Sequence, residues 1–352
     1  MSERRLYFGR CGALVWLLLL MPVPAAAAEP RLNQIQMIGS HNSYKQRMPA
    51  DRMAALAREN PGLAEALDYA HVPLPEQLDL GVRKLELDVY YDPRGDLFGR
   101  ADVSAGGGGP PARSAFPVLH VQNLDDVSSC VNLLACLGQL RAWSDAHPRH
   151  LPIFVSFNAK DDVIDRPEFL RPLPFAEDAW LALDAELRAV LGDRMITPAE
   201  VLPLPQPAPP QWPTLDAARG HFLFVLDEGG DKRREYVARW RERVMFTTVE
   251  PGEPGAAILI VNDPVADFAR IRALVNEGYI VRTRADADTR EARSGDTTRR
   301  DAAFASGAQL ISTDYYLPET RFDHAYQLQL PGGGVARCNP LAGADCSAAE
   351  IR

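Results

Sequence analysis

The sequence predicts a TIM-type (β/α)8 barrel of parallel strands. Three observations support this prediction: short apolar runs recur along the chain, helix-like stretches separate most of them, and polar residues close each run. Strand and helix alternating at this spacing are typical of parallel βαβ units buried on both faces, and eight such strands fit a closed barrel. The predicted strands are 35–40, 84–91, 117–121, 152–158, 221–227, 256–262, 279–283 and 309–313.

The stretches between the runs read as helices and loops. A doubly wound open sheet is the alternative fold, but no predicted strand is followed by the Gly-x-Gly-x-x-Gly turn that such a fold uses for a dinucleotide. The glycine run at 106–109 is predicted to be a surface insertion, and the proline-rich stretch 203–213 a loop within one domain. The predicted helices are 50–70, 133–146, 177–191, 231–243, 264–277 and 301–306.

The first 28 residues have the layout of a secretory signal peptide. Their apolar part is too short for a membrane span, which needs roughly 20 residues, and no later segment approaches that length. We therefore expect a mature chain that starts near Glu29, forms one domain over 29–352, is secreted or periplasmic, and has no transmembrane segment. The parts of the signal are Arg4, Arg5 and Arg10, the apolar run 13–23 and the small residues 25–28.

The charge balance disfavours a nucleic-acid partner. Asp and Glu number 47 against 38 Lys and Arg, which gives a formal net charge of −9. Binding to a phosphate backbone requires a basic surface. DNA or RNA binding is therefore not expected.

Removal of the signal leaves four cysteines in the mature chain. In an oxidising compartment the local pairs Cys130–Cys136 and Cys338–Cys346 are the simplest of three possible pairings. Four reduced core thiols are the alternative. A zinc site has little support, because no histidine lies at ligand spacing beside either pair.

Polar residues close the first four predicted strands, where a parallel barrel carries its functional groups. His41 and Asn42 follow the first strand, Glu86 and Asp88 lie in the second, and His120 ends the third; Asn158 ends the fourth and Lys160 follows it. Because side chains alternate along a strand, both carboxylates of the second strand point to the same face.

Two like charges inside a barrel are costly unless a cation neutralises them. Carboxylates with the amide oxygens of Asn42 and Asn158 nearby form a set of hard oxygen ligands. Such ligands suit calcium or magnesium better than zinc. His41 and His120, on neighbouring strands, are then expected to flank the ion as acid and base.

Three basic residues are candidate substrate contacts, each with a structural alternative. Lys160 either contacts phosphate or lies on the surface. Arg282 and Arg284 share a strand face, so they either form a phosphate clamp, since guanidinium matches phosphate oxygens, or pair with Asp286 and Asp314.

Several of these motifs together resemble a known family. Ile-Gly-Ser-His-Asn-Ser-Tyr at 38–44, Gly-Val-Arg-Lys-Leu-Glu-Leu-Asp-Val-Tyr at 81–90 and Val-Leu-His at 118–120 resemble the catalytic core of calcium-dependent phosphoinositide-specific phospholipase C. The later stretch Gly-Tyr-Ile-Val-Arg-Thr-Arg-Ala-Asp at 278–286, with Ser-Gly-Ala at 306–308 and Ser-Thr-Asp-Tyr at 312–315, is similar to the secreted, single-domain bacterial branch. The resemblance covers about 35–316.

This resemblance implies a TIM-type barrel, calcium and phosphodiester cleavage, with Asn42, Glu86 and Asp88 as ligands of the ion. The inositol 2-hydroxyl would attack the phosphorus and give a cyclic phosphate, His41 would stabilise charge on the phosphoryl oxygens, and His120 would protonate the departing diacylglycerol oxygen. The base is left open, with a metal-bound carboxylate as the candidate. Eukaryotic members carry a Glu ligand where this chain has Asn158, so the amide of Asn158 is the expected fourth ligand.

The expected partner is a phosphoinositide phospholipid at a membrane surface, and the chain is expected to be a monomer. A glycerophosphodiester phosphodiesterase is the nearest enzymatic alternative, although such enzymes usually carry His-Arg-Gly where this chain has His-Asn-Ser at 41–43. A secreted barrel that binds a polar head group without catalysis is the other alternative. The intact set His41, Glu86, Asp88 and His120 disfavours it.

Overall fold

The computed structural model describes residues 29–99, 113–343, 346 and 351 of the 352-residue chain. The predicted signal peptide at 1–28 and the glycine run at 106–109 lie outside the described residues.

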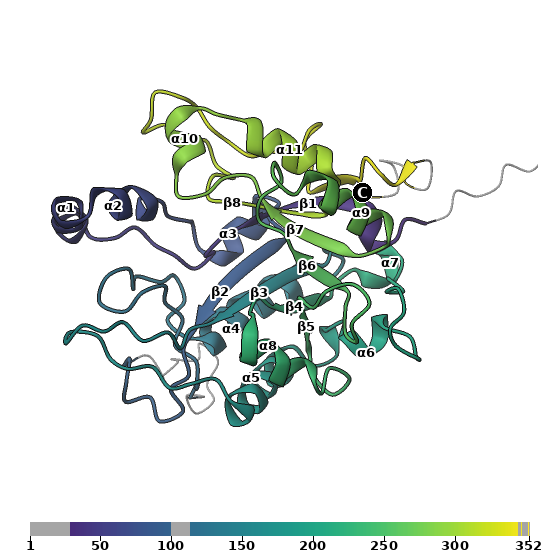
Figure 1. The fold of residues 1–352 in the computed structure, drawn as a ribbon, viewed down its shortest axis with the longest axis horizontal. Coiled ribbons are helices and arrows are strands. Elements are labelled where there is room, and N and C mark those ends of the chain that lie inside the picture. Colours follow the sequence, from purple (N-terminus) through teal and green to yellow (C-terminus); the bar gives the residue numbers. More distant parts are fainter. Residues whose placement is uncertain (1–28, 100–112, 344–345, 347–350, 352) are drawn as a thin grey trace, which may run out of the picture.

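Within the described residues, eight parallel strands form a nearly closed barrel in the order β5-β4-β3-β2-β1-β8-β7-β6 (Figure 1). A parallel bridge connects Thr247 of β5 to Ala256, two residues before β6, where the barrel closes. A short ninth strand, β9 (Ala336–Cys338), pairs antiparallel with β1. The predicted TIM-type barrel is therefore confirmed. The barrel strands are β1 (Ile35–Ser40), β2 (Lys84–Val89), β3 (Ile153–Ala159), β4 (Phe222–Leu226), β5 (Met245–Thr247), β6 (Ile258–Ile260), β7 (Ile280–Arg284) and β8 (Leu310–Thr313).

One of the eight predicted strands is wrong, and one barrel strand was not predicted. The run 117–121 makes only isolated antiparallel bridges, from Val118 to Val89, from Pro117 to Asn132 and from Val121 to Asp125, so it belongs to the loop after β2. Pro117, Val118 and Leu119 are buried, and the first two contact the end of β2 and the residue that follows it. Burial without a position in the sheet produces the same apolar pattern. The missing place is taken by β5, which is only three residues long.

Each of the six predicted helical stretches contains a helix, and one of these stretches is divided. The helix predicted at 231–243 ends at Val237, and the four short helices at 74–79, 198–201, 215–218 and 290–294 were not predicted. The predicted helix 50–70 is split, because Pro61 lacks a backbone N–H and Asn60 caps a new helix by accepting the N–H of Leu63 at 3.1 Å. Figure 1 shows α1 and α2 lying to one side of the barrel. The stretch 203–213 contains no helix or strand. The helices are α1 (Ala50–Glu59), α2 (Pro61–Leu67), α3 (Leu74–Asp79), α4 (Leu133–Ala146), α5 (Glu177–Leu191), α6 (Pro198–Val201), α7 (Leu215–Ala218), α8 (Gly230–Val237), α9 (Phe268–Asn276), α10 (Arg290–Ser294) and α11 (Thr298–Ser306), with 3-10 turns at Leu32–Gln34 and Gly192–Arg194.

Alternation along the strands separates the two largest apolar clusters of the described residues. On β4, Phe222 and Phe224 pack with Trp180 of α5, outside the barrel. Leu223 and Val225 belong to the second cluster, which fills the barrel interior. Toward the carboxyl ends of the strands, the side chains that face the barrel interior are polar. These polar side chains therefore gather at one mouth of the barrel.

Gly39 of β1 is required by a close approach inside the barrel. It lies opposite Lys84 of β2, and a Cβ at position 39 would be 2.6 Å from the Lys84 Cβ and 2.8 Å from its carbonyl oxygen. The lysine side chain therefore occupies the space beside β1 that any larger residue at 39 would need.

Both predicted disulfides are confirmed. Cys130–Cys136 ties the loop after β2 to α4, and Cys338–Cys346 links β9 to the C-terminal segment. Among the described residues, no helix is long and apolar enough to cross a bilayer.

Candidate active site

All nine site residues predicted from the sequence line one cavity of about 210 Å³ at the carboxyl ends of the strands. Strands β2, β3 and β7, together with the loops that follow β1, β2 and β3, supply these nine residues. Two further polar residues, Asp227 after β4 and Asn262 after β6, complete the lining. The nine are His41, Asn42, Glu86, Asp88, His120, Asn158, Lys160, Arg282 and Arg284.

Glu86 lies at the centre of a charged network. Its Oε2 is 2.5 Å from Lys84 Nζ and 2.8 Å from Arg282 Nη2, and its Oε1 accepts from Asn158 Nδ2 at 3.3 Å. Burial opposes ionisation, but Lys84 and Arg282 outweigh it and hold the pKa of Glu86 well below its usual range. One oxygen of an ionised carboxylate is thus held by two cations, while the other lies 3.7 Å from His41 Nε2.

Asp88, Asn158 and Lys160 form the neighbouring part of the network. Asp88 and Asn158 are direct cross-strand partners, and Asn158 Nδ2 donates to Asp88 Oδ1 at 3.2 Å. Lys160 Nζ lies 2.9 Å from Asp88 Oδ2. Of the two readings of Lys160, the structure places it in the cavity, paired with a carboxylate.

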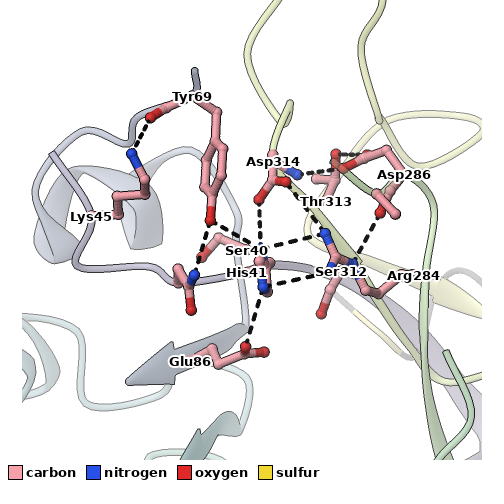
Figure 2. Close-up of polar contacts among 12 residues, drawn as sticks. Ser40, His41, Lys45, Tyr69, Glu86, Arg284, Asp286, Ser312, Thr313 and Asp314 are labelled. Atoms are coloured by element: carbon pink, nitrogen blue, oxygen red, sulfur yellow. Dashed lines mark hydrogen bonds and ion pairs between the residues drawn. The ribbon is translucent and has the colours of Figure 1, made fainter. Parts of the chain in front are cut away.

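His41 is held by a carboxylate from the far end of the chain. Its Nδ1 lies 3.0 Å from Asp314 Oδ1 and 3.3 Å from the hydroxyl of Tyr69 (Figure 2). Arg284 bonds Asp314 Oδ2 at 3.3 Å and also lines the cavity, so it pairs structurally while facing the substrate space. Burial and the adjacent Arg284 lower the pKa of His41, although Asp314 and Glu86 oppose the change.

Asp286 holds the backbone at Asp314 in place. The Asp314 backbone N–H donates to Asp286 Oδ1 at 2.8 Å, and Asp286 also accepts from the Thr313 hydroxyl. Burial opposes the ionisation of Asp314, but His41 and Arg284 outweigh burial and lower its pKa. An ionised Asp314 accepts a hydrogen bond from His41, which assigns the proton of a neutral imidazole to Nδ1 and leaves Nε2 as an acceptor.

His120 reaches the cavity from a loop and not, as predicted, from the end of a barrel strand. Its Nδ1 lies 2.9 Å from Asp125 Oδ2. The two residues face each other because Val121 and Asp125 exchange backbone hydrogen bonds of 3.0 and 2.8 Å in a tight turn. Both histidines therefore carry a buried carboxylate on Nδ1.

Comparison with known proteins assigns the family. Residues 30–340 match the family Phosphoinositide phospholipase C, Ca2+-dependent. The chain belongs to this family. No curated protein matches the chain significantly.

Two solved structures have the same fold as this phospholipase C family member. The calcium-dependent phosphoinositol-specific phospholipase C of a Pseudomonas species is 19% identical, with a TM-score of 0.54 over 90% of this chain and 98% of that chain. A calcium-dependent phosphatidylinositol-specific phospholipase C from Streptomyces antibioticus is 18% identical, with a TM-score of 0.52 over 82% of this chain and 95% of that chain.

The donor set of this phospholipase C family member suits a calcium ion, although no group of three or more His, Cys, Asp or Glu side chains is clustered tightly enough for a metal among the described residues. Asn42 donates through Nδ2 to the Tyr69 hydroxyl at 2.9 Å, so its oxygen is the atom available to an ion. Glu86 Oε1 and Asp88 add carboxylate oxygens, and hard oxygens are what calcium prefers. Asn158 presents its amide nitrogen to both carboxylates.

Sequence reasoning missed several residues of the site. Asp227 is the last residue of the predicted strand 221–227. It is a polar residue at a strand end, as are the other predicted site residues, so the signal for it was present. Burial raises the pKa of Asp227, and Arg282 opposes this. Asp125 and Tyr69 carried no comparable signal, because they meet the histidines only through loop contacts.

Proposed function

We propose that the chain is an exported, calcium-dependent phosphodiesterase that cleaves phosphatidylinositol-type phospholipids to diacylglycerol and a cyclic inositol phosphate. The observation that carries this proposal is the convergence of two histidines, each with a buried carboxylate on Nδ1, on one cavity that also holds hard oxygen ligands and cations. Family membership supports the phospholipase activity.

The geometry around His41 supports a role as the base that the sequence left open. With Nδ1–H directed to Asp314, the Nε2 lone pair of His41 faces Arg284 Nη1 at 3.4 Å. When the inositol 2-hydroxyl takes the place of this weak contact, Nε2 accepts its proton. The hydroxyl oxygen then forms the new bond to phosphorus. This role replaces the expected stabilisation of phosphoryl charge, for which Arg282, Arg284 and Lys160 are better suited because they carry permanent positive charge in the same cavity.

His120 acts on the leaving group. As the bond from phosphorus to the glycerol oxygen breaks, His120 donates a proton to that oxygen and diacylglycerol departs. Asp125 on Nδ1 stabilises the protonated imidazole and holds its Nε2–H toward the cavity. The two histidines thus accept one proton and release one proton in each turnover.

Asn42, Glu86 and Asp88 would hold calcium, with Asp227 as a further carboxylate of the cavity. Bound there, the ion supplies positive charge to the phosphoryl oxygens and to the inositol 2-hydroxyl. Asn158 fixes the two carboxylates relative to each other through its amide.

Export is supported by the two disulfides, since such bonds persist in oxidising compartments. We include in this proposal the removal of residues 1–28 as a signal peptide and a single domain over 29–352. A phospholipid substrate at a membrane surface and a monomeric chain complete it.

A substrate panel tests the proposal. The mature chain is incubated with phosphatidylinositol, glycerophosphoinositol and glycerophosphocholine, with His41→Ala and His120→Ala as inactive controls. Diacylglycerol release from phosphatidylinositol alone is expected. Preferred release of glycerol phosphate or choline from the soluble diesters would favour a glycerophosphodiesterase, and binding without turnover of any substrate would favour a head-group-binding barrel.

A further inference from the structure

A buried lysine outside the cavity contacts the supports of both histidines. Lys45 Nζ lies 3.2 Å from Asp125 Oδ1 and donates to the carbonyl oxygens of Leu67 at 3.0 Å and Tyr69 at 2.8 Å. The Lys45 and Asp125 side chains are each 1% exposed. Two backbone carbonyls accept hydrogen bonds from the ammonium group, and the Asp125 carboxylate pairs with its charge, so Lys45 is held from three directions.

The partners of Lys45 lead to the two histidines by separate routes. The other oxygen of Asp125, Oδ2, pairs with His120 Nδ1 at 2.9 Å. Tyr69, whose ring centroid lies 4.6 Å from Lys45 Nζ, places its hydroxyl 3.3 Å from His41 Nδ1. Figure 2 shows Lys45 bonded to the backbone of Tyr69 while the tyrosine ring extends toward His41.

The backbone around Lys45 joins the same two loops. Lys45 forms an antiparallel bridge with Ser128, Gln46 N–H donates to Val127 O at 3.0 Å, and Ser129 N–H donates to Tyr44 O at 2.8 Å. The loop that carries His120 and Asp125 is therefore anchored on the segment that directly follows His41. These backbone hydrogen bonds do not depend on the ion pair between Lys45 and Asp125. They also hold the His120 loop next to the segment that follows His41.

The positive charge of Lys45 keeps the Asp125 carboxylate ionised and directed at His120. A buried carboxylate with no counter-charge is unstable, and it responds by taking up a proton or by turning toward water. Either change would leave His120 without an ionised acceptor on Nδ1. A histidine that acts as an acid needs that acceptor to hold its ring and to stabilise its protonated form.

We propose that Lys45 is a positioning residue that holds the Asp125–His120 pair in register with His41, so that the acid and the base act on one phosphodiester. This inference rests on the proposed function, in which His120 protonates the leaving oxygen. Loss of Lys45 is therefore expected to slow the reaction mainly where that proton is needed.

The test compares two leaving groups. Wild type, Lys45→Met and Lys45→Arg are assayed for kcat and KM on phosphatidylinositol and on an inositol phosphodiester with a nitrophenyl leaving group, which departs without a proton. Lys45→Met is expected to lose about 10²-fold in kcat on the lipid, within the range that general acid catalysis supplies, but less than about tenfold on the nitrophenyl ester. Lys45→Arg keeps the charge and is expected to restore most of the lipid rate.

Lys232→Met is the matched control, because Lys232 is a half-buried lysine paired with Asp161 and Glu228 that contacts neither histidine. It is expected to change both substrates equally and by less than threefold. Equal losses on the two substrates in Lys45→Met would overturn the inference. If His120→Ala itself fails to discriminate between the leaving groups, the acid role in the proposed function is wrong; discrimination in His120→Ala but not in Lys45→Met refutes the role of Lys45 alone.

A double variant covers the case in which Lys45→Met does not fold. Lys45→Met combined with Asp125→Asn leaves no unpaired buried charge, and it is compared with Asp125→Asn alone. Equal rates on the lipid are expected, because Lys45 acts through Asp125. A further tenfold loss on both substrates in the double variant would contradict that route.

Discussion

His41 and Asp314 form a hydrogen-bonded pair of 3.0 Å although 273 positions separate them in the chain. His41 follows β1 and Asp314 follows β8. These strands pair in parallel with Ser40 opposite Thr313, so His41 and Asp314 lie side by side. Closure of the barrel thus joins an N-terminal motif to a C-terminal carboxylate. The pair exists only in the folded chain, so its contribution is open to a direct mutational test.

Asp314→Asn should lower kcat on phosphatidylinositol by about 10²-fold or more, because an amide cannot hold the His41 proton on Nδ1 as a carboxylate does. KM should change less than threefold, since Asp314 does not line the substrate cavity. Steady-state kinetics together with thermal unfolding separate this effect from a loss of folded protein. A kcat within threefold of wild type would show that His41 works without this partner.

Gly39→Ala should destabilise the barrel by roughly 1–3 kcal/mol or more, because the new Cβ would overlap with Lys84 in a packed interior. Denaturant unfolding measures the loss. Gly138→Ala is the matched control: Gly138 lies in α4 with nothing within 4 Å of its added Cβ, and alanine there should raise stability by about 0.5–1 kcal/mol. Equal effects of the two substitutions would contradict the packing described for β1 and β2.

Asp227→Asn should weaken calcium binding by about tenfold, which corresponds to ~1.4 kcal/mol, because it removes one carboxylate from the cavity. Titration calorimetry on the purified chain reads this without reference to activity. Glu228→Gln is the matched control, because it removes a negative charge at the next residue of the chain. The Glu228 carboxylate accepts a hydrogen bond from the Ala159 N–H and does not line the cavity. Its affinity should stay within about twofold of wild type, and an identical loss in both variants would point to a general charge effect.

Glu186 should make stability depend on pH. Burial raises its pKa to about 7 from the ordinary 4.5, although the hydrogen bonds from Ala115 N–H and the Ser114 hydroxyl oppose the change. The folded state therefore holds this proton more tightly than the unfolded state, so the stabilisation is complete below pH 4.5 and disappears as the pH rises through about 7. We compare the melting temperatures of Glu186→Gln and wild type at two pH values. The difference, variant minus wild type, should be larger at pH 8 than at pH 5 by ~2 °C or more. Parallel pH profiles for the two proteins would rule out this titration.

Much of the site was predictable because a parallel barrel carries its functional residues at the carboxyl ends of its strands. Glu86, Asp88 and Asn158 have positions fixed by period-two alternation and by direct cross-strand pairing, so local sequence determined where they lie. His120 was found for the wrong reason: its run is apolar and buried, yet it belongs to a loop. The Asp125–Lys45 pair depends on the contact between two loops, and no period in the sequence encodes such a contact.

The fold shows the same division between local and non-local information. Strands of five or more residues with buried inward and outward faces were predictable, as in β1 and β3. The three-residue β6 was predictable because it lies in the longer apolar run 256–262. The apolar run at β5 is only Val-Met-Phe at 244–246, and pairing with β4 makes it a strand. Asn60 and Pro61 together explain the break between α1 and α2, and both signals are visible in the sequence once a helix boundary is considered there.

Phosphorus NMR of the first product formed from phosphatidylinositol tests the central claim most directly. The mature chain is followed in buffer containing calcium and in excess EGTA, with oxygen-18 water in both. The proposed mechanism predicts a cyclic inositol phosphate without solvent oxygen as the first product, formed with calcium and absent with EGTA. A linear inositol phosphate that carries solvent oxygen from the first turnover, or an unchanged rate in EGTA, would contradict it.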